Sequence, residues 1–162
     1  MDAANTYHRR AAAGATPVGL IVLLYQAAVV ALRRGIAAMD AGDIEARTLA
    51  LNRVLALVAE LKASLNYETG GEVARQFARF YHLAERLILQ ASCQKDAEPL
   101  RELLEQFVRV RDAWQQVDKL PPEQQRDPVT SLANLPPLPE TPDNLLEFRA
   151  PAVREGRPSG KA

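Results

Sequence analysis

The sequence predicts an all-α protein, an antiparallel up-down four-helix bundle with a short N-terminal helix or capping segment and a proline-rich C-terminal tail. Four long segments carry apolar residues at helical spacing, and short turns marked by glycine or proline separate them. Nine of the eleven prolines lie between Pro121 and Pro158, where no helical period survives. Residues 1–120 are therefore expected to form one helical domain, capped by residues 1–15, and residues 121–162 an extended tail mostly without regular structure.

Composition and charge exclude several classes of function. The 162 residues are 48% hydrophobic and 25% charged, which suits one globular domain with a real core. Lys plus Arg equals Asp plus Glu at 20 each, so no net charge would hold nucleic acid or an acidic membrane surface. A lone cysteine, Cys93, excludes an internal disulfide bond and is typical of a reducing compartment.

The N-terminal region carries a basic pair, Arg9–Arg10, ahead of the apolar run Val18–Leu32, an order also found in signal peptides. Tyr25 interrupts the run, and a second pair, Arg33–Arg34, follows it where a cleavage site would need small residues. We therefore interpret the run as a buried helix of a soluble protein, with no membrane insertion. Residues 1–13 add a short helix whose stability alone would be marginal.

The first long helix is predicted from Pro17 to about Met39. Thr16 supplies a hydroxyl cap, and a proline at the first helical position loses no hydrogen bond. Apolar residues occupy nearly every side of this helix, so something besides its two bundle neighbours is expected to cover it. These residues are Leu20, Ile21, Leu23, Leu24, Ala27, Ala28, Val30, Ala31 and Leu32.

The second helix is predicted from its cap, Asp43, to about Leu65, after a turn that contains Gly42. Leu57 falls at the edge of the core stripe and Leu49 well outside it, so both widen the apolar face. The expected core stripe consists of Ile44, Leu51, Val54, Leu55, Val58, Leu61 and Leu65.

A glycine pair, Gly70 and Gly71, is predicted to form the corner at which the second helix ends. Glycine reaches left-handed backbone angles without steric cost, and Glu72 would then suit the positive end of the next helix dipole. The third helix should extend from Glu72 to about Ser92. Its inward residues are expected to be Val73, Phe77, Phe80, Ala84, Leu87, Ile88 and Ala91.

The fourth helix follows Asp96 and Pro99 and is predicted to end near Lys119. Because the loops between the long helices are only a few residues long, consecutive helices should be antiparallel neighbours. The expected core stripe of the fourth helix is Leu100, Leu103, Leu104, Phe107, Val108, Trp114 and Val117.

No arrangement of residues in the sequence predicts catalysis. A di-iron bundle needs a Glu-x-x-His motif on each of two helices, and the chain, whose two histidines are His8 and His82, has no such motif. Cys93 has no histidine near it in the sequence, and the acidic residues of the third helix are interpreted as cap and surface residues. We therefore expect no enzyme, no metal site and no cofactor, with a metal-dependent bundle enzyme as the weakest alternative.

The apolar surplus of the first three helices has several interpretations. The N-terminal segment or the tail could cover it, or a permanent homo-oligomer could bury it. The functional interpretation is a groove for an amphipathic client segment with apolar residues at i, i+3, i+4 and i+7. Exposed apolar surface usually indicates some partner without naming it, so periodicity alone leaves these alternatives open.

Three stretches of the chain resemble one known family. The run ATPVGLIVLLYQAAVVAL, the stretch LNYETGGEVARQFARFYHLAERL and the ending VRVRDAWQQV together resemble the flagellar secretion chaperones, the FliS family, over about residues 5–118. The resemblance implies a cytoplasmic export chaperone that binds the C-terminal region of flagellin, prevents premature polymerisation and delivers flagellin to a flagellar export gate component of the type III apparatus. It implies neither catalysis nor a cofactor, and a homodimer in the absence of the client is compatible with it.

The resemblance also implies which residues contact the client. Tyr7 matches the N-terminal tyrosine of the family, Leu20 and Tyr25 belong to its first-helix signature, and Gly70 and Gly71 match its corner, with a structural role. Each expected contact also has a core interpretation, because large apolar side chains at helical spacing usually pack inward. The expected client-binding residues are Tyr7, Leu20, Tyr25, Leu49, Leu57, Tyr67, Ala74, Ala78 and Tyr81.

The tail departs from the family pattern, because family members generally end soon after the tryptophan, which is Trp114 here. Three interpretations of the tail are open: an inert extension, a recruiting arm, or a surrogate client. In the last of these, LPPLPETPDNLLEF (residues 135–148) would lie on the protein's own groove. A tether supports that hypothesis because it raises the effective concentration of the segment to about millimolar.

Overall fold

The computed structural model describes residues 14–125, which form four long helices and one short helix. Their bounds are α2 (Pro17–Asp40), α3 (Ile44–Ala63), α4 (Tyr67–Gln94), α5 (Glu98–Asp118) and α6 (Pro122–Gln125). The described residues contain no strand, so the expected all-α class is confirmed. Of the expected cap, only Gly14 and Ala15 are described, and the tail after Gln125 lies outside the described residues.

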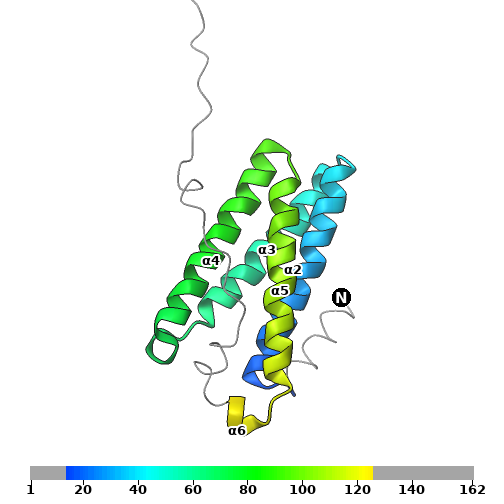
Figure 1. The fold of residues 1–162 in the computed structure, drawn as a ribbon. Coiled ribbons are helices and arrows are strands. Elements are labelled where there is room, and N and C mark those ends of the chain that lie inside the picture. Colours follow the sequence, from blue (N-terminus) through cyan, green and yellow to red (C-terminus); the bar gives the residue numbers. More distant parts are fainter. Residues whose placement is uncertain (1–13, 126–162) are drawn as a thin grey trace, which may run out of the picture.

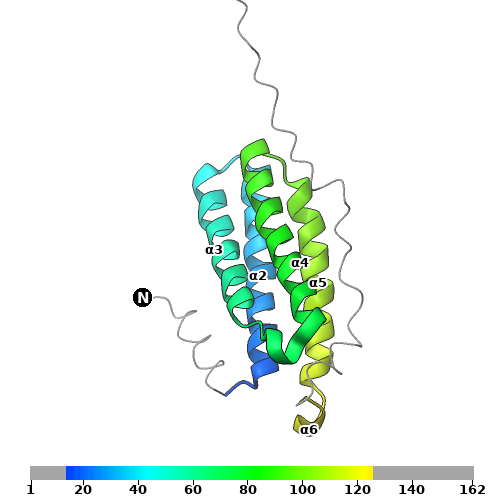
Figure 2. The same cartoon turned by 90° about the vertical axis from the view of Figure 1, so that its left-hand side faces the viewer.

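The four long helices close into a bundle in which each packs on the helices next to it in sequence, and α2 also packs on α5 (Figure 1). Consecutive helices are antiparallel, as the turned view shows (Figure 2). α2 therefore lies diagonally across the core from α4, and α3 lies across from α5. This is the up-down topology that the short loops predict.

Side-chain caps mark where the first two helices begin. Thr16 Oγ1 accepts a hydrogen bond from Gly19 N at 2.9 Å, and Pro17 occupies the first position of α2. Before α3, Asp43 Oδ1 accepts a hydrogen bond from Ala46 N, also at 2.9 Å. Each cap satisfies an amide that the helix itself leaves unpaired, and both were expected from the sequence.

The corner between α3 and α4 differs from the prediction that the glycine pair ends the earlier helix. α3 already ends at Ala63, and α4 begins at Tyr67, because Asn66 Oδ1 caps it by accepting hydrogen bonds from two backbone amides at 3.0 and 3.2 Å. Gly71 (φ 48°, ψ −125°) then interrupts α4 after about one turn. The glycine pair therefore makes the second bend of a two-step corner, visible at the lower end of α4 in Figure 2.

Buried residues of all four long helices form one hydrophobic core, and two residues of α3 differ from their expected places. Ile44, expected in the core, is 65% exposed because it is the first residue of α3, at the end of the bundle. Leu57, expected at the edge of the stripe, is buried because α2 approaches α3 closely. The largest fully buried side chains include Tyr25, Phe107, Leu32, Leu57, Leu61, Ile88, Leu100 and Leu103.

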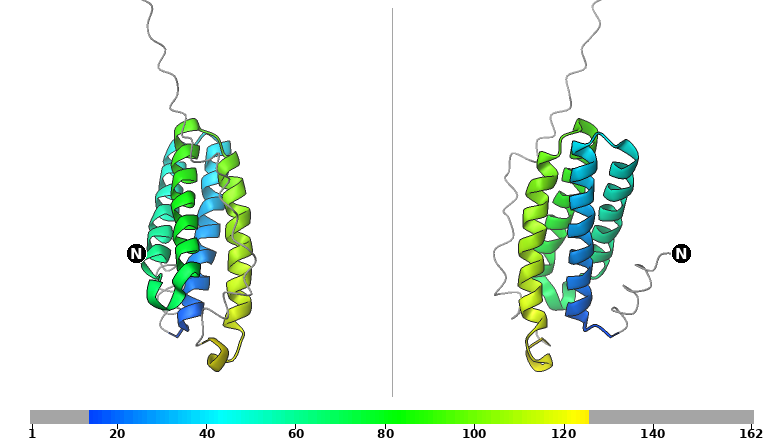
Figure 3. Two further views of the ribbon diagram at one scale, coloured as in Figure 1. Left: turned by 60° about the vertical axis from the view of Figure 1, so that its left-hand side comes forward. Right: turned by 90° about the vertical axis from the view of Figure 1, so that its right-hand side faces the viewer.

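Within residues 14–125, α2 is the one helix that is long and apolar enough to cross a membrane by length and composition. Ten of its residues are nevertheless buried against the rest of the bundle. Figure 3 shows α2 between α3 and α5, with one side toward the core and one side facing outward. Such packing is typical of the core helix that the sequence predicts.

Candidate functional site

The outward side of α2 is the most unusual surface in the described part of the chain. Leu20, Leu23, Ala27 and Val30 recur at i, i+3, i+7 and i+10, which places them within about 80° of arc on one helix face. Leu20 is 39% exposed and Val30 47% exposed, while the two residues between them are half-buried. We call these four residues the outer stripe.

The inward side of the same helix is fully used by the core. Tyr25, Ala28 and Leu32 have no exposed surface, and they lie roughly opposite the outer stripe around the helix. A helix that serves only the core needs one apolar face, and α2 has two. The outer stripe is therefore apolar surface that the four-helix core does not require.

Small residues bring α2 and α3 close together. A methyl group added at Gly35 would come within 2.9 Å of Leu51 Cδ2, which is shorter than a normal carbon contact. Ala28, Ala31 and Ala38 are buried on the same helix and leave room for the same approach. The close packing fixes the orientation of α2 and hence the direction in which the outer stripe points.

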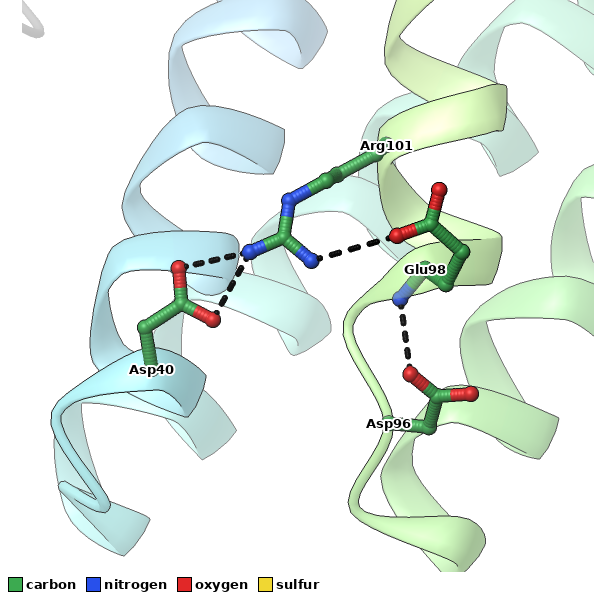
Figure 4. Close-up of polar contacts among 4 residues, drawn as sticks. All are labelled: Asp40, Asp96, Glu98 and Arg101. Carbon is green, nitrogen blue, oxygen red and sulfur yellow. Dashed lines mark hydrogen bonds and ion pairs between the residues drawn. The ribbon is translucent and has the colours of Figure 1, made fainter.

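Polar contacts hold both ends of α2 against α5. At its beginning, Thr16 Oγ1 donates a hydrogen bond to Asp118 Oδ1 at 2.8 Å. At its end, Arg101 Nη2 binds both carboxylate oxygens of Asp40 at 2.8 and 2.9 Å (Figure 4). Hydrogen bonds to Asp40 raise the pKa of the Arg101 guanidinium, and the nearby Glu98 adds to this effect.

Asp96, in the turn before α5, belongs to the same group of residues. Asp96 Oδ1 accepts a hydrogen bond from Glu98 N at 3.0 Å, and the Glu98 carboxylate lies 3.5 Å from Arg101 Nη1 (Figure 4). This series of contacts, centred on Arg101, joins the beginning of α5 to the end of α2. These contacts are exposed, so their effect is to set the register of the two helices more than to stabilise the fold.

A buried pair of hydroxyl groups crosses the core from α2 to α4. The phenolic oxygens of Tyr25 and Tyr81 lie 2.9 Å apart, and each supplies the hydrogen-bond partner that the other needs. Burial raises the pKa of both phenols above the ordinary value. Both groups are therefore neutral near pH 7 and act as a polar contact inside an apolar core.

Aromatic rings surround this pair on the α4 and α5 side of the core. The ring centroids of Tyr25 and Phe107 are 5.3 Å apart, and those of Phe80 and Phe107 are 5.5 Å apart. Phe77 lies 6.0 Å from Trp114 by the same measure. Tilted pairs at these distances are favourable, and the large rings fill the wider space between α4 and its neighbours.

The outward side of α4 is charged, unlike that of α2. Glu72 binds Arg75 at 3.0 Å and Arg79 at 2.8 Å, and these hydrogen bonds, led by that of Arg79, lower the pKa of Glu72. Nearer to α3, Lys62 Nζ lies 3.0 Å from the Glu85 carboxylate. This surface is a solvated face with no comparable apolar stripe.

The structure separates the predicted client-binding residues into two groups. Leu20 lies in the outer stripe, Leu49 is 67% exposed on α3, and Tyr67 is 53% exposed at the start of α4, while Ala78 is half-buried. Tyr7 lies outside the described residues. The remaining predicted contacts lie in the core, and they are Tyr25, Leu57, Ala74 and Tyr81.

Sequence reasoning did not select Leu23, Ala27 and Val30 as site residues, although it noted that they are apolar. The signal was present as the spacing i, i+3, i+7 and i+10, which continues from Leu20. It was not decisive, because nearly every side of this helix is apolar and the direction of the core cannot be read from α2 alone.

The described residues offer little for catalysis. Residues 14–125 hold no group of three or more His, Cys, Asp or Glu side chains that could bind a metal ion. Cys93 is exposed near the end of α4.

Comparison with known proteins agrees with this arrangement. The flagellar secretion chaperone FliS of Salmonella typhimurium is 33% identical over 104 residues, which are 64% of this chain and 77% of the relative. The FliS chaperone of Campylobacter jejuni is 30% identical over 113 residues, 70% of this chain and 88% of the relative. That of Vibrio cholerae is 29% identical over 109 residues, 67% and 78% of the two chains.

A family model described as flagellar protein FliS matches residues 1–121. The match includes the whole helical bundle and excludes most of the proline-rich tail. Because it extends over much more than half of the 162 residues, the chain belongs to the FliS family of flagellar proteins.

Proposed function

We propose that this protein is a flagellar secretion chaperone that binds the C-terminal region of flagellin in the cytoplasm. By holding that region it prevents premature polymerisation, and it delivers flagellin to a component of the flagellar type III export gate. The protein does no catalysis in this role. The observation that carries the proposal is the outer stripe of α2, an apolar surface beyond the needs of the core on a chain of this family.

The exposed residues are the proposed direct contacts. Leu20 and Val30 are the exposed ends of the outer stripe, and Leu49 on α3 and Tyr67 at the start of α4 are further exposed apolar side chains. Tyr25 and Tyr81 support this surface from within the core, where their hydroxyl groups meet. An extended client with short amphipathic helices could reach all four exposed residues.

The free energies of client ordering and of apolar burial indicate how many client contacts are needed. A disordered client loses about 2–5 kcal/mol or more on ordering. Burying one leucine or valine side chain returns about 1.5–3 kcal/mol, an upper estimate because the free client is partly compact. One contact is therefore insufficient and several are necessary, which favours a broad surface over a single pocket.

Calorimetric titration of the full chain with a flagellin C-terminal peptide tests the proposal. We expect a one-to-one complex. We also expect Leu20→Glu combined with Val30→Glu to weaken it at least tenfold. Loss of the two apolar contacts should cost more than about 1.4 kcal/mol of binding free energy, which corresponds to a factor of ten in affinity. Leu89→Glu is the matched control, since Leu89 is an exposed leucine on α4. Its affinity should stay within about twofold of wild type.

The result that would contradict the proposal is a peptide that does not bind, or that binds the double variant as tightly as wild type. Circular dichroism must show unchanged helical content in each variant, because the substituted positions are exposed. Light scattering tests the main alternative, a permanent homo-oligomer that uses the outer stripe. The chaperone should be converted to a one-to-one complex by the peptide, whereas a structural oligomer would keep its mass.

A further inference from the structure

The C-terminal tail leaves the bundle beside the first turn of α2. Gln125 Nε2, at the end of α6, donates a hydrogen bond to the backbone oxygen of Asp118 at 2.9 Å. The side chain of the same Asp118 accepts the hydrogen bond from Thr16, the cap of α2. Gln125, the last described residue, is therefore connected through Asp118 to the beginning of α2. α2 begins at Pro17, and Leu20, the first residue of the outer stripe, follows within its first turn.

The outer stripe is followed by unpaired positive charge. Arg34 continues the same face one turn after Val30, and Arg33 lies beside it; both are exposed. Arg53 is exposed on α3, about one turn after Ala50, which packs beside Gly35 of α2. None of the three arginines forms an ion pair with another residue of the range 14–125, so this end of the surface is apolar and basic.

The tail contains one segment with the complementary composition. Residues 135–148, LPPLPETPDNLLEF, carry five large apolar side chains and three acidic residues, with no lysine or arginine. An inert spacer needs neither the apolar cluster nor the single sign of charge. The acidic residues are Glu140, Asp143 and Glu147, and the large apolar residues are Leu135, Leu138, Leu145, Leu146 and Phe148.

The connection between Gln125 and this segment is long enough for it to reach the stripe. Nine residues, 126–134, extend to about 30 Å at about 3.3 Å per residue. The outer stripe ends at Val30, thirteen residues or about 20 Å from the beginning of α2 at about 1.5 Å per residue. The segment can therefore lie along the whole stripe without disturbing the bundle.

We propose that residues 135–148 bind intramolecularly to the outer stripe of α2, with their acidic residues toward Arg33, Arg34 and Arg53. The family match ends at residue 121, so this occupant is an addition of this chain and not part of the matched bundle. The segment competes with the client for the same surface, and this consequence rests on the proposed function. The binding itself does not, because it involves only this chain.

The tether sets the expected size of the competition. A flexible link of this length gives an effective concentration of about millimolar. For a segment whose own dissociation constant is about 0.1–1 mM, the free surface falls about two- to tenfold, and the apparent client affinity falls by the same factor. The tail is thus expected to tune client binding without preventing it.

Paramagnetic relaxation in the full-length chain tests the binding directly. Cys93→Ser with Ala37→Cys carries a nitroxide label at an exposed position of α2 beyond Val30, and Cys93→Ser with Gln76→Cys carries the control label on α4. We expect the amide signals of residues 135–148 to lose at least half their intensity with the first label and to be unchanged with the second. Tail signals that are unaffected by both labels would overturn the proposal.

Two further outcomes would also overturn it. In a mixture of nitroxide-labelled chain at natural isotope abundance with isotope-enriched chain that carries no nitroxide, the tail signals should be unchanged. Broadening of the tail signals in that mixture would mean that the tail of one molecule binds the stripe of a second copy. Broadening of residues 1–13 in place of the tail would assign it to the N-terminal segment. Either result removes the tail as the occupant.

Charge variants test the basis of the interaction. Arg33→Glu with Arg34→Glu should reduce the broadening of residues 135–148 at least twofold, whereas Arg109→Glu, at an exposed position of α5, should not change it. Persistence of the full broadening in the arginine double variant would contradict the proposed complementarity.

The effect on client binding separates this inference from the proposed function. Glu140→Lys, Asp143→Lys and Glu147→Lys together should raise the affinity for the flagellin peptide about two- to tenfold. If the peptide binds neither protein, the proposed function fails while the relaxation data still decide the tail. If the peptide binds both proteins equally and the tail signals are unaffected by the labels, the inference fails alone.

Discussion

α2 and α4 lie diagonally across the core from one another, and the outward sides of the two helices differ in composition. α4 has its apolar stripe toward the core, and its outward side carries ion pairs such as Glu72 with Arg75 and Arg79 beside the exposed Leu89. α2 is apolar on both sides, with Tyr25 and Leu32 inside and the outer stripe outside. Only one of the two helices therefore presents an apolar face to a partner.

The packing of the two helices differs in the same way. Gly35 and buried alanines bring α2 close to α3, whereas Phe77, Phe80 and Tyr81 hold α4 at a greater distance from its neighbours. Small residues position α2 without using its outer side chains, and large rings supply most of the apolar burial. We infer that the aromatic side of the bundle provides stability, while the small-residue side orients the binding surface.

The largest expected effect comes from the aromatic side. Phe107→Ala should lower the free energy of unfolding by about 3–5 kcal/mol, because it removes a fully buried ring and leaves a cavity beside Tyr25 and Phe80. Urea denaturation followed by circular dichroism measures the change. Val30→Ala on the outer stripe should change stability by less than about 0.5 kcal/mol, and an equal loss for both variants would contradict the division.

Gly35→Leu tests the close approach of α2 and α3. Its side chain would meet Leu51, so we expect a loss of about 1–3 kcal/mol in the free energy of unfolding. Ala37→Leu, at an exposed position of the same helix, is the matched control and should be nearly neutral. If both variants unfold at the same denaturant concentration, the close approach does not contribute as described.

The hydroxyl pair between the two regions can be tested with a double-mutant cycle. Tyr25→Phe or Tyr81→Phe alone leaves one buried hydroxyl without its partner and should cost about 1–3 kcal/mol. The double variant should lose less than the sum of the two single losses, because no orphan remains. Strictly additive losses would show that the two hydroxyl groups do not interact.

The same pair predicts a dependence of stability on alkaline pH. Burial raises the pKa of Tyr25 and Tyr81 above the ordinary value of about 10. Their contribution is fully present below about pH 10 and is lost as the pH rises toward the folded-state values, by up to about 1.4 kcal/mol per pH unit for each phenol. Chemical denaturation from about one pH unit below to about one pH unit above the ordinary tyrosine pKa of about 10 measures the effect. The free energy of unfolding should decline less for the double Phe variant than for wild type. An identical decline in the two proteins would contradict this account.

The smallest expected effect is at the far end of α2. Arg101→Gln removes the contact with Asp40, and we expect a slight decrease in thermal midpoint at low ionic strength that disappears in high salt. Thermal scans at two salt concentrations measure it. A large decrease that persists in high salt would mean that this exposed contact does more than set the register.

Helix positions and most of the core could be predicted from the sequence, because local signals determine them. Thr16 and Asp43 are caps that sit directly before periodic apolar residues, and both cap their helices as expected. The corner was harder, since Asn66 is also a good cap and competes with the more obvious glycine pair. Gly71 bends a helix that Asn66 has already started.

The candidate site could be predicted only in part, because spacing alone does not distinguish a core face from a binding face. Tyr25, Leu57 and Tyr81 are apolar or aromatic residues at helical spacing, and their burial depends on how closely the neighbouring helix approaches. Leu20 and Leu49 were selected by the same reasoning and are exposed. Only the assembled bundle separates the two groups.

The central claim is that a flagellin C-terminal segment binds to the outward side of α2. Methyl NMR spectra of isotope-labelled full-length chain, recorded during titration with the unlabelled peptide, test it most directly. The account predicts the largest shift changes at Leu20, Leu23 and Val30, with little change at Leu89 on α4. Shift changes confined to α4, or an unperturbed outer stripe at saturating peptide, would contradict it.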